Sequence, residues 1–64
     1  MLDQNLLNLL DLVLMELSDK DNRYFYDIDN NGCCILKCEC RTGVIILDFF
    51  KTNNSLCKFL VLHL

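Results

Sequence analysis

The spacing of apolar residues changes near residues 18–22 and divides the chain into two parts. Before this point, apolar side chains recur every three or four positions, as on one face of an amphipathic helix. At about 100° per residue they fall within one arc of roughly 160°. These residues are Leu2, Leu6, Leu7, Leu9, Leu10, Val13, Leu14 and Leu17. The pattern predicts a helix over residues 3–18, with Asp3 as a candidate N-cap.

Beyond residue 22, short apolar runs alternate with turn residues, which indicates β-strands. We predict strands over residues 23–29, 33–41 and 44–50. Asn31-Gly32 is a hairpin signal, and we expect a type I′ turn there, in which both central residues have positive φ. Thr42-Gly43 indicates a second tight turn. The strands are therefore expected to form an antiparallel meander.

The segment 56–64 fits two interpretations. As a strand, it places Cys57, Phe59 and Val61 on one face. As a helix, it would be capped by Ser55 and would carry an apolar stripe of Leu56, Phe59, Leu60 and His63. We favour a strand, because the run is short.

Together these elements predict one α+β domain over residues 1–64, with an N-terminal amphipathic helix packed on a small antiparallel β-meander of three to four strands. A chain of 64 residues buries only about 60% of its unfolded surface. Chains of this size usually add disulfides, a metal or a second subunit to a marginal core.

The third predicted strand is apolar on both faces, which is typical of a strand buried on both sides. Strict alternation places Val44, Ile46 and Phe50 on one of these faces. The N-terminal helix can cover only one side of a sheet, so the other side needs the C-terminal segment folded as a helix, a second subunit or a foreign protein. We therefore expect a homodimer, joined through the second face of the sheet or by edge strands, with these three residues in its interface.

Two apolar residues, Leu12 and Met15, fall on the polar side of the predicted helix, where Asp11, Glu16 and Asp19 also lie. They are either scattered exposed residues, which are common, or a contact patch, since methionine is favoured at adaptable contacts. We take these five residues as the candidate partner-binding site.

Charge is unevenly distributed along the chain. Residues 1–29 carry seven acidic and two basic residues, a net charge of −5, whereas residues 30–64 carry two acidic and four basic residues, a net charge of +2. No basic patch is dense enough to predict direct nucleic-acid binding. The apolar N-terminal run lacks the positive flank of a signal peptide. We expect a cytoplasmic protein without a membrane segment.

Five cysteines offer a second kind of chemistry. They are Cys33, Cys34, Cys38, Cys40 and Cys57. Paired Cys-x-x-Cys turns, which are usual in structural zinc sites, do not occur, and the odd number argues against a full disulfide framework. Reduced core thiols are the favoured interpretation, and no metal or cofactor is assigned. A metal- or redox-responsive regulator using Cys34, Cys38, Cys40 and Cys57 remains the alternative.

Residues 27–32 match the opening of an EF-hand calcium loop, with oxygen ligands at alternate positions followed by glycine. The closing bidentate glutamate of such a loop would fall at Cys38, and Glu39 is one residue away. We therefore interpret the segment as an Asp/Asn-rich hairpin turn.

No catalytic set is evident, because no group orients a thiol and His63 for nucleophilic chemistry. We expect a non-enzymatic protein-binding module that acts by stoichiometric occupation of a partner protein. Small size favours an inhibitor or adaptor of the type that phages and mobile elements encode, for example an inhibitor of a host defence system such as CRISPR. A structural subunit of a larger assembly is a further alternative.

Overall fold

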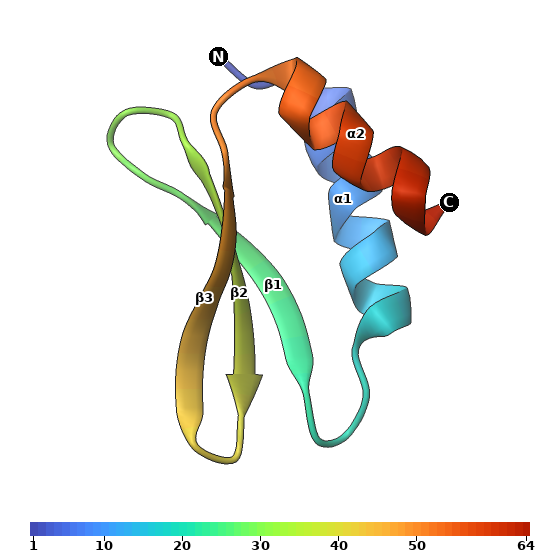
Figure 1. Ribbon diagram of the computed structural model, residues 1–64, viewed down its shortest axis with the longest axis vertical. Coiled ribbons are helices and arrows are strands. Elements are labelled where there is room, and N and C mark those ends of the chain that lie inside the picture. The colour runs from blue at the N-terminus through green and yellow to red at the C-terminus, as the bar shows by residue number, and fades with distance from the viewer.

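The fold consists of a three-stranded antiparallel sheet and two helices, and it is of the α+β class (Figure 1). The computed structural model describes residues 1–64. The elements are α1 (Gln4–Leu17), β1 (Arg23–Ile28), β2 (Cys34–Cys40), β3 (Gly43–Phe50) and α2 (Asn53–His63). The strands follow in the order β1-β2-β3, which confirms the predicted meander.

Helix α1 forms where the apolar period predicts it. The Asp3 side chain caps its first turn by accepting a hydrogen bond of 2.7 Å from the Asn5 amide. Leu10 is fully buried, and Leu14 is nearly so. At the other end, the Ser18 hydroxyl donates to the Leu14 carbonyl and accepts from the Tyr24 amide at 2.8 Å. This side chain therefore ties the end of α1 to the start of β1.

The C-terminal segment is a helix, so the preference for a strand over residues 56–64 is wrong. Thr52, and not Ser55, is the N-cap of α2, and the two residues form a capping box. The Thr52 hydroxyl accepts from the Ser55 amide at 3.1 Å. Leu56 and Leu60 lie one turn apart and are both buried. The cap and this helical spacing outweigh the weak two-residue alternation of the segment.

The β1–β2 hairpin forms as predicted, but its turn differs. Asp29 and Cys33 pair through their backbone groups and close a three-residue loop. Only glycines have positive φ, which is +80° at Gly32, so Asn31 does not adopt the type I′ conformation. The Asp29 carboxylate stabilises the loop instead, by accepting from the amides of Asn31 and Cys33.

Both helices pack on the same face of the sheet, which we call the helix face. The core joins buried side chains of α1 and α2 to those of Cys34, Leu36 and Phe50. Figure 1 shows the two helices in one layer beside the strands. The opposite face, which we call the open face, is covered by neither helix. The result is a two-layer fold with one bare side. Neither α1 nor α2 has the length and apolar character that a membrane-spanning helix requires.

A β-bulge in β3 reverses which side chains face the core. Leu36 pairs with Asp48, but its neighbour Lys37 pairs with Ile46, which leaves Leu47 as the extra residue. Strand alternation is therefore broken, and Phe50 points into the core, where it is 3% exposed. The expectation that Phe50 shares a surface with Val44 and Ile46 is corrected, because those two residues lie on the open face.

Candidate protein-binding site

The outward side of α1 carries the two apolar residues that the sequence singles out. Leu12 is 59% exposed and Met15 is 66% exposed. They are three residues apart and therefore neighbours on one face of the helix. We call this pair the α1 crest. Neither side chain belongs to the core, so the fold itself does not require an apolar residue at either position.

An apolar groove lies beside the α1 crest, between α1 and the end of α2. Its volume is about 210 Å³, and Leu9, Leu12, Glu16, His63 and Leu64 contribute to its walls. Leu9 is partly exposed although the helical period places it in the buried arc. The groove exists because α2 crosses α1 at this point, so sequence reasoning could not find it while residues 56–64 were taken for a strand.

The three acidic residues of the candidate site lie in different surroundings. Glu16 contributes to the groove. Asp11 lies near Tyr26, and its charge is the second cause, after burial, that raises the pKa of that phenol. The Asp19 carboxylate accepts hydrogen bonds from the amides of Asp21 and Asn22 at 2.8 and 2.9 Å. Asp19 therefore shapes the α1–β1 loop, while Glu16 flanks the crest.

Electrostatics distinguish this side of the molecule. Residues 1–19 contain four acidic residues and no lysine or arginine. The α1 crest and its groove are therefore apolar, with Glu16 beside them and no lysine or arginine on the same helix. Such a surface matches a partner that offers apolar side chains flanked by basic ones.

The cysteines do not gather into one site. Cys34 and Cys38 are buried on the helix face of β2, Cys40 is half-buried at its end, and Cys57 is exposed on α2. All five thiols are free, and no group of three His, Cys, Asp or Glu side chains could hold a metal ion. The arrangement gives no support to the alternative of a metal-responsive regulator.

The environments of these thiols differ strongly. Burial, with a smaller effect of Cys33, raises the pKa of Cys34 to about 11. Burial also raises the pKa of Cys38. At Cys40, hydrogen bonding with Thr42 lowers the pKa, and the two side-chain atoms lie 3.3 Å apart. Because the thiolate is the reactive form, Cys40 is chemically the most activated of these three.

This difference predicts an order of alkylation. In the folded protein, we expect iodoacetamide to modify Cys57 and Cys40 first. Cys34 should react at least about 100-fold more slowly, because a pKa near 11 leaves little thiolate and burial blocks access. Intact-mass analysis over time, with peptide mapping, measures the order. Equal rates at Cys34 and Cys57 in folded protein would contradict the described core.

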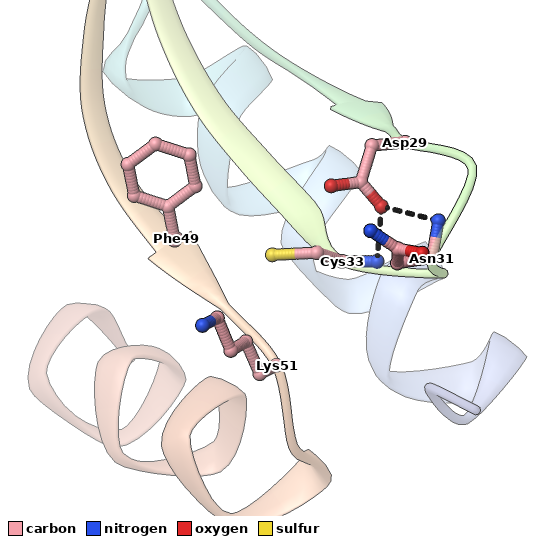
Figure 2. A pocket seen from close by; sticks show the side chains of 5 residues that line it. All are labelled: Asp29, Asn31, Cys33, Phe49 and Lys51. Carbon is pink, nitrogen blue, oxygen red and sulfur yellow. Dashed lines mark hydrogen bonds between the residues drawn. The ribbon is translucent and has the colours of Figure 1, made fainter.

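A shallow depression of about 670 Å³ lies beside the β1–β2 turn, where Cys33, Phe49 and Lys51 approach Asp29 (Figure 2). Figure 2 shows the Asp29 carboxylate turned back to the amides of its own loop. This group therefore serves the hairpin, in agreement with the interpretation of residues 27–32 as a turn. The depression brings no second thiol or histidine to Cys33.

The residues expected at a dimer interface also separate. Val44 and Ile46 lie on the open face of β3 and are each more than half exposed. Phe50 instead packs in the core, where the centroids of its ring and the Phe59 ring are 5.2 Å apart. Phe49 takes the place of Phe50 beside Val44 and Ile46. The bulge that causes this exchange leaves no sequence signal.

Comparison of the chain with protein-family models, curated proteins and solved structures found no match.

Proposed function

We propose that this protein is a small protein-binding module that occupies a site on a partner protein with one-to-one stoichiometry. The observation that carries the proposal is the α1 crest, where Leu12 and Met15 stand exposed beside an apolar groove. Contiguous exposed apolar surface is characteristic of interaction sites.

The chemistry of this surface indicates the kind of partner. The groove would accept one or two apolar side chains, while Met15 supplies a flexible contact that adapts to the partner's shape. Glu16, on a helix without lysine or arginine, favours a partner segment that carries lysine or arginine and disfavours an acidic one. A basic amphipathic helix fits these requirements, with its apolar face against the crest.

A module of this kind acts by covering a surface and performs no reaction. We place it with stoichiometric inhibitors and adaptors, including those that phages and mobile elements direct at host defence systems such as CRISPR. The support for this narrower class is the small size of the chain. The support for binding as such is the α1 crest.

Replacing Leu12 and Met15 together by lysine tests the proposal. We expect the affinity for the partner to fall about 10- to 100-fold, because two apolar contacts are lost and positive charge faces a basic surface. Partners are first captured on the immobilised wild-type protein, and the purified partner is then titrated calorimetrically against both forms. The stability of the variant should stay close to that of the wild type, because both positions are exposed.

Val61→Lys serves as the matched control. Val61 is an exposed aliphatic residue on the outer side of α2, and it is not part of the groove. It receives one lysine where the double variant receives two, and it lies outside the groove. If the Leu12/Met15 variant binds the partner as tightly as this control does, the crest is not the binding site.

A further inference from the structure

The outer edge of β3 is unpaired and carries exposed apolar side chains. β3 ends the sheet, so alternate backbone amides and carbonyls point away from the molecule without strand partners. Its apolar side chains are 45–56% exposed on both faces of the strand. These residues are Val44, Ile45, Ile46, Leu47 and Phe49. Natural proteins rarely leave such an edge free, since it readily pairs with another strand.

The open face of β1 and β2 carries charged side chains that form ion pairs. On the open face, Arg23 pairs with Glu39 at 3.1 Å, and Lys37 pairs with Asp27 at 2.7 Å. These ion pairs bridge β1 and β2 and share the open face with Phe25 and Ile35, which are half-buried. Of the large apolar side chains that are exposed on the sheet, five lie on β3 and one, Ile28, lies on β1. This distribution favours contact through β3, which is an edge strand.

We propose that β3 pairs in antiparallel fashion with β3 of a second copy of this chain. A two-fold axis that brings the same edge of two sheets together antiparallel must run perpendicular to the sheets. The helix faces of the two copies then lie on the same side. The product is a continuous six-stranded sheet with four helices on one face.

The same arrangement explains an exposed residue of α2. At 100° per residue, Leu62 lies on the flank of α2 that also carries Phe59. That flank is turned to β3, because the Phe59 ring packs on Phe50 and lines a cavity with Leu47. Leu62 is 82% exposed in the single chain. Because α2 packs over β3, a two-fold axis at the β3 edge places the α2 helices of the two copies side by side. Leu62 of each copy is then covered by the second copy.

The available area suits a dimer of this size. The five exposed side chains of β3 and Leu62 together present on the order of 500–600 Å² of apolar surface. The backbone edge and the adjoining Arg41-Thr42 turn add to it. A standard interface buries about 800 Å² per partner. Since edge pairing buries only the part of these side chains that is turned to the second strand, the interface lies toward the low end of the range for specific dimers.

Charge is compatible with self-pairing. Residues 43–47 carry no charge, so strands that cross near Ile45 bring no like charges together. Arg41 precedes this stretch and Asp48 follows it. In an antiparallel pair, the start of one strand lies beside the end of the other, so Arg41 of each copy approaches Asp48 of the second copy. Opposite charges at both ends of the pairing support this orientation.

This inference is independent of the proposed function and adds to it. The dimer leaves both α1 crests exposed and places them on the same side of the sheet. Two identical sites then face one way, which raises the apparent affinity for a repeated or dimeric partner.

Solution mass measured by light scattering on a sizing column, under reducing conditions, tests the inference. We expect about 15 kDa, twice the 7.5 kDa of one chain. Ile46→Lys places like charges on the pairing edge and should weaken association at least tenfold, which yields monomer. Val44→Lys is a second variant with the same expectation. Both positions are more than half exposed, so the core remains intact, and circular dichroism verifies this.

Phe25→Lys is the discriminating control. Phe25 lies on the open face of β1, the strand farthest from the free edge of β3. In the proposed dimer it stays in solvent, so this variant should remain dimeric. A wild-type protein that is monomeric at all concentrations overturns the inference. So does a dimer that Phe25→Lys disrupts, since that result would show two open faces packed together.

Discussion

Replacing Leu10 by alanine is expected to lower the free energy of unfolding by about 3–4 kcal/mol, the largest effect of any single substitution considered for this chain. Leu10 is fully buried, and it packs in the core that α1 shares with the sheet and α2. The substitution removes apolar contacts and leaves a cavity that the surroundings cannot fully close. Since a single core of this size rarely supplies more than about 3–5 kcal/mol, the variant should be largely unfolded at 37 °C.

Leu12→Ala is the matched control for this experiment. It makes the same chemical change two residues along the same helix, but at a position that is more than half exposed. We expect a change in stability within about 0.5 kcal/mol. Urea unfolding followed by circular dichroism measures both variants. Equal losses would mean that the α1 crest is buried in solution, which contradicts its assignment as a free surface.

Alkaline pH is expected to destabilise the protein through Cys34. Its pKa is about 11 in the folded protein, against 9.0 for the free thiol, so the folded state holds the proton more tightly. The stabilisation of the folded state by the protonated Cys34 thiol is complete below pH 9 and is lost as the pH rises through 11. The loss from this one group is on the order of 2–3 kcal/mol. The raised pKa values of Tyr26 and Cys38 act in the same direction, and the lowered pKa of Cys40 opposes them.

Comparison of Cys34→Ala with Cys57→Ala isolates this contribution. Cys34→Ala should be less stable than the wild type at neutral pH, because a buried side chain is shortened, but it should lose less stability between neutral pH and pH 11. Cys57→Ala changes an exposed thiol and should keep the pH dependence of the wild type. Unfolding midpoints in urea across this range give the result. Identical pH profiles for the two variants would exclude Cys34 as the cause.

The sequence predicts those parts of the fold that local patterns determine. The apolar period of residues 2–17 defines both α1 and its buried side, so Leu12 and Met15 stand out as residues that the core does not need. The hairpin also follows from its turn residues. In each case the deciding information lies within a few positions of the chain.

Other features depend on contacts between distant segments. Residues 56–64 form an apolar face both as a helix and as a strand. The packing space beside α1 and Phe50 selects the helix, which begins after the Thr52 cap. The β3 bulge at Leu47 has no local signal, yet it sends Phe50 into the core and Phe49 to the open face. The groove beside the α1 crest requires the position of α2. Its walls could therefore not be assigned from sequence.

Amide hydrogen exchange in β3, followed by NMR at increasing protein concentration, tests most directly the claim that this exposed edge is an interface. In the pairing described, the outward amides of β3 become hydrogen-bonded donors, and their exchange should slow at least tenfold as concentration rises. The β1 edge strand, whose outer edge stays unpaired, provides the internal reference. If the outward amides of β3 exchange at the rate of free amides at every concentration, β3 does not pair with a second copy of the chain.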